Sequence, residues 1–437
     1  MSAIGGALPS VARLRRAEWL SRRSAFLRGG VLVFGANLVW NASNFAFNAI
    51  AARSLGPRSY GELAAAVVLL YVASPVLVSV QTVVSRVATA LDVRGEQDLL
   101  RSALALHLKR LAFVATVIAG ALALSSSAVA RFLRLDSGIP IAIVGVGLCL
   151  SLFPHCQRGV LQGTQRFDRL AASVAVEATA KVVGAIALLT VWHSTDAAVT
   201  AIPLSAACGL AINALLLRCL PDSVSGSRAA LTLHAGSQTV ATLATFLLLA
   251  LLLSADVLAA KRYLPSNLAG IYAAVSLCGK IVYFATSAIS LLLFPHFSAR
   301  RERNRDSRRP FVASLGVVAV CSAVIVAAYF AVPQVVVRVL YGPTYKAAAP
   351  YLGWIAVAFA AYALAYLAAT YLLAQRSWAG AGALAVVTLG QLASLYALHG
   401  SIGEIVAVQV AILGSAALGL IFLALQPTHG FAGARRG

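Results

Sequence analysis

The chain has 437 residues, of which 60% are hydrophobic and only 11% are charged, and its mean hydropathy is +0.86. Soluble domains carry roughly 25% charged residues, so this chain has too little charge to cover a soluble surface of its size. Its composition also argues against a disordered chain, a disulfide scaffold and a nucleic-acid-binding domain, despite the formal net charge of +21. We therefore expect an all-α polytopic membrane protein.

The first 28 residues are basic and contain no long apolar run. The apolar run that follows is longer than the core of a signal peptide and contains four asparagines, so we expect a retained first helix. Windows of about 20 apolar residues, the length that crosses a bilayer, predict twelve spans. These lie at residues 29–51, 62–85, 110–130, 139–163, 170–192, 199–220, 238–260, 269–296, 311–332, 350–373, 378–398 and 403–425.

The positions of the 35 Lys and Arg residues predict the orientation of these spans. About three times as many lie on the side of the N-terminus as on the opposite side, and cytoplasmic loops are enriched in these residues. We therefore expect a multi-pass protein of the cytoplasmic (plasma) membrane with both termini in the cytoplasm.

An internal repeat predicts two bundles of like orientation. The segment AARSLGP at 51–57 resembles AAKRYLP at 259–265, VARFL at 129–133 resembles VVRVL at 336–340, and QR at 165–166 recurs at 375–376. The offset between the matching segments is about 208 residues, as expected of a duplicated six-helix unit. We therefore expect a basic tail at 1–28, six-helix bundles at 29–220 and 238–425, a cytoplasmic linker at 221–237 and a tail at 426–437.

The chain resembles the polysaccharide-transporter family of lipid-linked oligosaccharide flippases, within the multidrug/oligosaccharidyl-lipid/polysaccharide superfamily. The resemblance rests on ARSLGPRSYG at 52–61, LQGTQRF at 161–167 and LYGPTY at 340–345. In the first motif, Gly56 permits a backbone conformation closed to other residues, Pro57 stops the helix, and Tyr60 suits an interfacial aromatic position. The second copy has Leu264-Pro265 in place of Gly56-Pro57, so its turn need not be the same.

Asparagines form a polar stripe on the first span. Asn37, Asn41, Asn44 and Asn48 are spaced by four, three and four residues, which places them within about a 60° arc of one helix face. We interpret the stripe as the lining of a water-filled cavity that offers hydrogen bonds to sugar hydroxyls. Hydrogen bonding between helices is the alternative. The resemblance implies that this helix faces the central cavity.

Four basic or titratable residues inside or near the spans are predicted to bind substrate: Arg86, His155, Arg158 and Lys280. Lys280 lies near mid-membrane, where it would attract a phosphate-bearing headgroup, unless it pairs with Asp256 or Glu177. Arg86 and Arg158 have a simpler alternative, because both could snorkel to the cytoplasmic interface.

Three further residues are candidates for ion coupling. Glu177 and Lys181 form an i, i+4 pair, for which a structural role is the alternative. Asp256 is the one carboxylate well inside a span for which the sequence shows no partner. The six cysteines form no CxxC motif and no cluster with histidine, and no nucleotide-binding loop is visible, so we expect no metal and no cofactor.

The leading prediction is a flippase that moves an oligosaccharide, linked to polyprenyl diphosphate, for cell-envelope polysaccharide synthesis. We expect its partners to be this substrate, membrane lipid and a glycosyltransferase or polymerase of the same pathway, but no nucleic acid. The alternative is an ion-coupled multidrug or metabolite antiporter of the same superfamily. A glycan polymerase or ligase is disfavoured because the longest outer loop, 333–349, has neither a carboxylate nor a histidine.

Overall fold

A computed structural model describes residues 8–96, 99–218, 237–302 and 307–426. Every regular element in these residues is helical, as the composition predicts. The α-helices are α1 (Leu8–Val93), α2 (Leu99–Leu133), α3 (Ile139–Gly163), α4 (Phe167–Val191), α5 (Thr195–Leu216), α6 (Ser237–Tyr263), α7 (Ser266–Glu302), α8 (Arg308–Ala331), α9 (Pro333–Tyr341), α10 (Leu352–Ala374), α11 (Trp378–Ala397) and α12 (Ile402–Leu425). A 3₁₀ helix, η1 (Pro343–Tyr351), precedes α10.

The long helix α1 contains two of the predicted spans. Eleven helices in the described residues are long and apolar enough to cross a membrane, and the first of them runs from Val31 to Val93. Gly56, with φ 71° and ψ 174°, interrupts this helix, because only glycine adopts that conformation without strain. The prediction of twelve spans is therefore confirmed, with the first two joined at Gly56.

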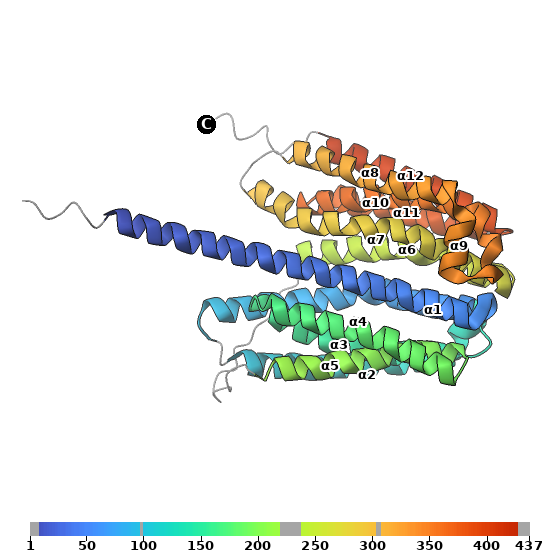
Figure 1. The fold of residues 1–437 in the computed structure, drawn as a ribbon, viewed down its shortest axis with the longest axis horizontal. Helices are drawn as coiled ribbons and strands as arrows, with labels where there is room; N and C mark the ends of the chain where they lie inside the picture. Colours follow the sequence, from blue (N-terminus) through green and yellow to red (C-terminus); the bar gives the residue numbers. More distant parts are fainter. Residues whose placement is uncertain (1–7, 97–98, 219–236, 303–306, 427–437) are drawn as a thin grey trace, which may run out of the picture.

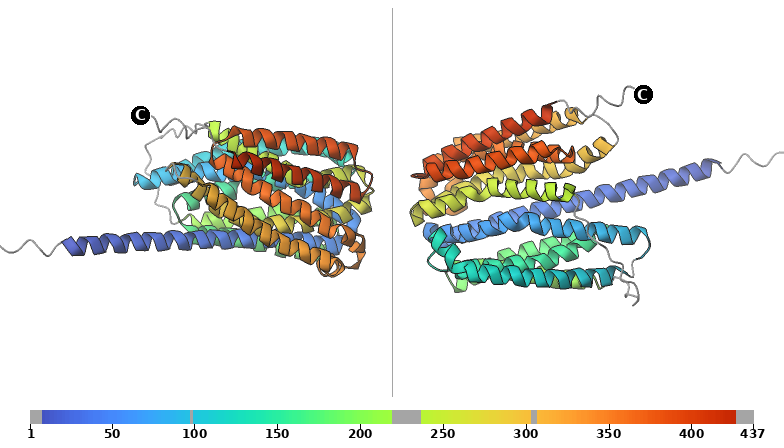
Figure 2. Two further views of the ribbon diagram at one scale, coloured as in Figure 1. Left: turned by 90° about the horizontal axis from the view of Figure 1, so that it is seen from above. Right: turned by 180° about the vertical axis from the view of Figure 1, so that it is seen from behind.

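The helices form two bundles, and α1 runs along the boundary between them (Figure 1). The two halves of α1 and α2–α5 make the first bundle, in which α1 and α3 pack against several neighbours. The second contains α6, α7, α8, α10, α11 and α12, and it is centred on α10, which packs against α7, α8 and α12 and is buried along most of its length. The start of α1 extends past the other helices in all three views (Figures 1 and 2).

The predicted tails and linker fall wholly or partly outside the described residues. These segments are 1–28, 221–237 and 426–437, and α1 is helical already from Leu8. The predicted boundaries of the bundles, 29–220 and 238–425, remain predictions.

The repeat is visible in the backbone as well as in the sequence. The amide of Arg166 donates to Leu161 O after α3, and that of Ser377 donates to Leu372 O after α10, so both helices end in the same glycine-free Schellman-type turn. The left-handed residues in these turns are Gln165 and Arg376. The structural repeat is thus one residue out of register with the QR match of the sequence.

The connection expected as the outer loop 333–349 is mostly helical. Residues 333–341 form α9, which ends at Gly342 with φ 89°. The chain then forms η1 before the tenth span. The turn of the second half also differs from that of the first. The left-handed Gly56 has no counterpart, because α6 simply stops at Tyr263 and Pro265 precedes α7.

Backbone contact between Gly61 and Gly270 joins the two bundles at the end of the molecule where α6 finishes and α7 begins. We call this contact the joint. A Cβ placed on Gly61 would lie 2.9 Å from Gly270 N, and one placed on Gly270 would lie 1.6 Å from Pro57 O. No side chain fits in either place without movement of the backbone. The start of α7 therefore packs directly against the start of the second half of α1.

We predict that Gly270→Ala lowers the midpoint of thermal unfolding by roughly 3 °C or more, because the new methyl group overpacks the joint between the bundles. The matched control is Gly316→Ala on the exposed face of α8, where a Cβ meets nothing within 4 Å. That control is expected to leave the midpoint unchanged or slightly raised, because alanine favours helix. Equal midpoints for both variants, measured on purified protein, would contradict the close packing.

Candidate functional site

A buried charged cluster occupies the interior of the first bundle. Arg158 of α3 and Glu177 of α4 form an ion pair with 2.5 Å between Nη2 and Oε2, and their side chains are only 4% and 3% exposed. Two charges removed from water to this extent require good geometry and further hydrogen bonds. The pair therefore fixes how α3 and α4 face each other.

Neighbouring residues complete this ion pair. Arg158 also donates from Nε to Ser173 Oγ at 2.8 Å and from Nη2 to the carbonyl of Ser173 at 3.2 Å. On the far side, Gly209 of α5 leaves room for the carboxylate, because a Cβ there would lie 2.4 Å from Glu177 Oε2. Three helices thus shape the pocket that holds one carboxylate.

Lys181 contributes a second cation to the cluster. It lies one helical turn from Glu177 on α4, is 6% exposed, and donates from Nζ to Asn44 Oδ1 of α1. Its Nζ is 4.1 Å from the centre of the Trp40 ring, within cation–π range. The cluster contains two cations and one anion, and its excess positive charge lies beside Trp40 and the asparagine stripe.

These contacts correct two sequence-based interpretations. The predicted intrahelical pair of Glu177 with Lys181 is not the ion pair that forms, because Glu177 pairs with Arg158 on another helix. Arg158 does not snorkel, since its side chain is buried. Two other residues predicted to bind substrate differ from Arg158. Arg86 is exposed, and Nδ1 of half-buried His155 lies 2.7 Å from the carbonyl of Ser151 in its own helix.

The asparagine stripe changes environment along α1. Asn48 is buried and donates to the carbonyl of Asn44 at 2.8 Å, whereas Asn37, Asn41 and Asn44 are half-buried. Asn37 donates to the carbonyl of Val33 at 3.0 Å. The stripe is therefore most buried near the joint of the bundles and more accessible towards the other end of the helix.

The second bundle contains its own buried pair, Asp256 of α6 and Lys280 of α7. Asp256 Oδ1 and Lys280 Nζ are 4.0 Å apart, and Asp256 Oδ2 accepts hydrogen bonds from Tyr272 at 2.9 Å and Ser276 at 2.6 Å. Asp256 is thus paired, which corrects the interpretation that it lacked a partner. For Lys280 the pairing alternative is the one that forms, while Asp256 Oδ1 itself has no hydrogen bond within the described chain.

A set of polar contacts surrounds the glycine joint between the bundles. Lys261 of α6 lies 3.5 Å from Glu62 of α1, and both side chains are buried. Arg53 donates to the carbonyls of Leu340 and Val339 at the end of α9, and Tyr345 donates to the carbonyl of Ala52 at 3.0 Å. The ARSLGPRSYG motif therefore binds the second bundle at this end.

Tyr60 belongs to this joint and not to the membrane interface. It is 1% exposed, packs edge-on against Tyr345 with 6.3 Å between ring centres, and its hydroxyl lies 3.5 Å from Asn48 Oδ1. The interfacial position expected from sequence is wrong, because the second bundle covers the ring. The local sequence around Tyr60 contains no sign that a distant part of the chain covers this ring.

Several buried polar residues escaped the sequence analysis. Gln391 of α11 donates to Gln409 of α12 at 3.1 Å and to the carbonyl of Leu252 at 2.9 Å, and both glutamines are fully buried. Both are uncharged amides inside predicted spans, so the pattern that marks the asparagine stripe also marks them. In the described residues no group of three His, Cys, Asp or Glu side chains could hold a metal ion.

The fold is similar to that of solved membrane transporters. A multidrug resistance MATE family transporter of the MOP superfamily in an inward-facing conformation matches at a TM-score of 0.75, with 12% identity over 90% of this chain and 96% of the other. Its family's outward-facing structure matches at 0.62, with 14% identity over 92% and 94%. A MOP superfamily transporter from Pyrococcus furiosus, described as having a binding pocket of reverse polarity, matches at 0.54, with 13% identity over 92% and 95%.

Sequence comparison supplies the family. No curated protein sequence matches this chain. A family model described as polysaccharide biosynthesis protein matches residues 50–350. This range includes the residues of both bundles that form the joint, and both buried ion pairs. Because this match spans more than half of the chain, the protein belongs to the polysaccharide biosynthesis protein family and has the fold of MOP-superfamily transporters.

Proposed function

We propose that this protein is a flippase that carries a lipid-linked oligosaccharide, held on a polyprenyl diphosphate, across the cytoplasmic membrane by alternating access. Membership in a polysaccharide biosynthesis family and the fold of MOP transporters support a transporter and not an enzyme. The substrate, the plasma membrane and the cytoplasmic position of both termini are part of the proposal. A glycosyltransferase or polymerase of the same pathway would supply or consume the cargo.

The excess positive charge of the buried cluster carries this proposal. Arg158 and Glu177 neutralise each other, which leaves Lys181 as the excess cation of the cluster, in contact with the neutral amide of Asn44 and the ring of Trp40. The pair of Asp256 and Lys280 in the other bundle is neutral. A diphosphate headgroup is attracted by such an interior, whereas a cationic drug is repelled.

The asparagine stripe suits the sugars of the same cargo. Amide groups both donate and accept hydrogen bonds, as sugar hydroxyls require. Asn37 and Asn41 are half-buried and lie about one turn apart on the part of α1 away from the joint. In the proposal the stripe binds the glycan, Lys181 attracts the diphosphate beside the pair of Arg158 and Glu177, and Arg86 and His155 act nearer the cytoplasmic entrance.

The closed joint supports an inward-facing state. Glu62 with Lys261, and Arg53 with the end of α9, hold the bundles together at the end predicted to be extracytoplasmic. The higher TM-score with the inward-facing transporter than with the outward-facing one agrees with this. Release of the cargo outside requires these contacts to separate, while the lipid tail stays in the bilayer.

One observation favours the alternative, an ion-coupled antiporter. Asp256 Oδ1 is fully buried with no hydrogen bond inside the described chain, and such a carboxylate is a place where a proton or sodium ion could bind. Coupling through Asp256 or Glu177 would then drive the export of a small molecule. The experiment on the lipid pool distinguishes the two functions.

We expect cells depleted of the protein to accumulate a complete lipid-linked oligosaccharide on the cytoplasmic leaflet. The measurement is mass spectrometry of polyprenyl-linked glycans, combined with an assay of which leaflet contains them, in a strain without related transporters. A normal pool on the normal leaflet contradicts the flippase. Ion-gradient-dependent efflux that is lost in Asp256→Asn would then support the antiporter.

Lys181→Met is expected to reduce glycan transport at least tenfold in the same cells, because it removes the excess cation and leaves the pair of Arg158 and Glu177 intact. Membrane abundance of the variant is measured in parallel. The control is Lys346→Met, which removes an exposed lysine from η1 and should transport normally. Wild-type transport by the Lys181 variant would exclude a role of the cluster in attracting the headgroup.

Cross-linking tests whether the joint must open. Cysteines introduced at Glu62 and Lys261, in a background whose six native cysteines are replaced, should react with a short thiol-cleavable bifunctional reagent. We expect transport to stop after cross-linking and to recover after reduction, since the bundles can then separate again. A cysteine pair at Arg94 and Lys261 is the control, because Arg94 follows the end of α1, far along that helix from Glu62, the residue beside Lys261. Undiminished transport by the cross-linked protein would rule out opening at this end.

A further inference from the structure

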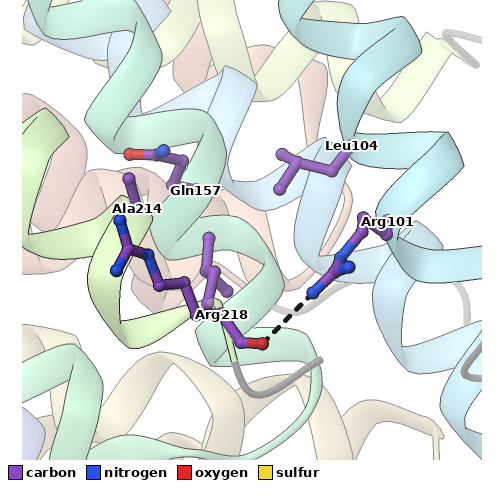
Figure 3. Close-up of a pocket in the computed structure, with 6 residues that line it drawn as sticks. Arg101, Leu104, Gln157, Ala214 and Arg218 are labelled. Carbon is purple, nitrogen blue, oxygen red and sulfur yellow. Dashed lines mark hydrogen bonds between the residues drawn. The ribbon is translucent and has the colours of Figure 1, made fainter. Parts of the chain in front are cut away.

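A cavity of about 380 Å³ lies in the first bundle, apart from both buried ion pairs. It lies at the end where α5 finishes and α2 begins, which is the end predicted to be cytoplasmic. Six residues from three helices and the residues just after α5 line it (Figure 3). These are Arg101, Leu104, Gln157, Ala214, Leu217 and Arg218.

The packing of three helices explains why space remains there. Helix α3 packs closely against both α2 and α5, whereas α2 and α5 have few contacts with each other in the described part of the chain. The cavity therefore lies between α2 and α5, with α3 as its floor. Arg101 Nη2 of α2 donates to the carbonyl of Arg218 at 3.1 Å and joins the two sides (Figure 3).

The lining combines positively charged with apolar side chains. It contains two arginines and no carboxylate, and the side chain of Arg218 is exposed. Leu104, Ala214 and Leu217 supply the apolar part. α2 buries little of its most apolar stretch against the protein, so this helix faces lipid. A ligand that fits both parts of the lining has an anionic head and an apolar body.

Gln157 adds a second and independent indication of a ligand. This α3 residue is only 4% exposed, and its Oε1 has no hydrogen-bond partner in the described chain. A buried amide oxygen without a partner is costly, so a hydrogen-bond donor on a bound ligand would stabilise Gln157 here. In Figure 3 the amide of Gln157 and the guanidinium of Arg218 both lie beside Ala214. The complementary headgroup combines a phosphate with a hydroxyl group.

We propose that this cavity binds the headgroup of an anionic phospholipid that bears a hydroxyl, as in phosphatidylglycerol. The guanidinium of Arg218 binds the phosphate, with Arg101 adding positive charge, and a headgroup hydroxyl donates to Gln157 Oε1. The apolar part of the lining contacts the start of the acyl chains. The proposal does not depend on which cargo the protein transports.

The test uses the full-length protein in nanodiscs of phosphatidylcholine with phosphatidylglycerol or with phosphatidic acid, which lacks the headgroup hydroxyls. Retained lipids are counted by native mass spectrometry. Arg218→Gln is expected to weaken retention of both anionic lipids about fivefold, the usual effect of one basic residue near an anionic surface. Gln157→Leu is expected to remove the preference for phosphatidylglycerol over phosphatidic acid and to leave the phosphate contact.

The control is Arg94→Gln, which removes one exposed arginine from the turn after α1 and should retain both lipids as the wild type does. The proposal is overturned if Arg218→Gln and Arg94→Gln retain lipid equally. It is also overturned if inorganic phosphate displaces phosphatidylglycerol, because the site would then bind free phosphate. A wild-type protein that retains no anionic lipid excludes the site altogether.

Discussion

The cost of placing an ionised side chain in hydrocarbon governs the interior of this protein. Each described charge deep in a span has a partner: Arg158 has Glu177, Lys280 has Asp256, and Lys181 has an amide and an aromatic ring. Such pairs are weak sources of stability, since desolvation consumes most of their attraction, but removal of one member is strongly destabilising. The pairs therefore fix which helices are neighbours more than they stabilise the bundle.

The same constraint explains how far the sequence could be interpreted. Spans are visible because every backbone group in lipid must be satisfied inside a helix, so length and hydropathy suffice to count them. The asparagine stripe is visible because helical periodicity places it on one face. The partner of Glu177 is not visible, because the choice between Lys181 on its own helix and Arg158 on the next depends on packing.

The joint between the bundles shows a second limit. The motif around Gly56 and Tyr60 was expected to shape a turn and to face the membrane interface, and only the first expectation is confirmed. Arg53 and Glu62 contact residues more than about 190 positions away, on the other bundle, and no local pattern encodes such pairing. The repeat predicted like orientation of the halves, and Leu264-Pro265 already indicated that the turn at Gly56 need not recur, but nothing in the sequence predicted that α9 would be helical.

The glycine joint has a mechanical consequence. Gly61 and Gly270 meet backbone to backbone, so no side chain of either residue interlocks with the other bundle when the joint closes. If the bundles rotate about their opposite ends, about 30 Å away across the hydrocarbon layer, a rotation of about 10° separates the two glycines by roughly 5 Å. A larger residue at either position would hold the bundles apart before the joint closed. The absence of a side chain at these two positions thus sets how completely the protein can close at this end.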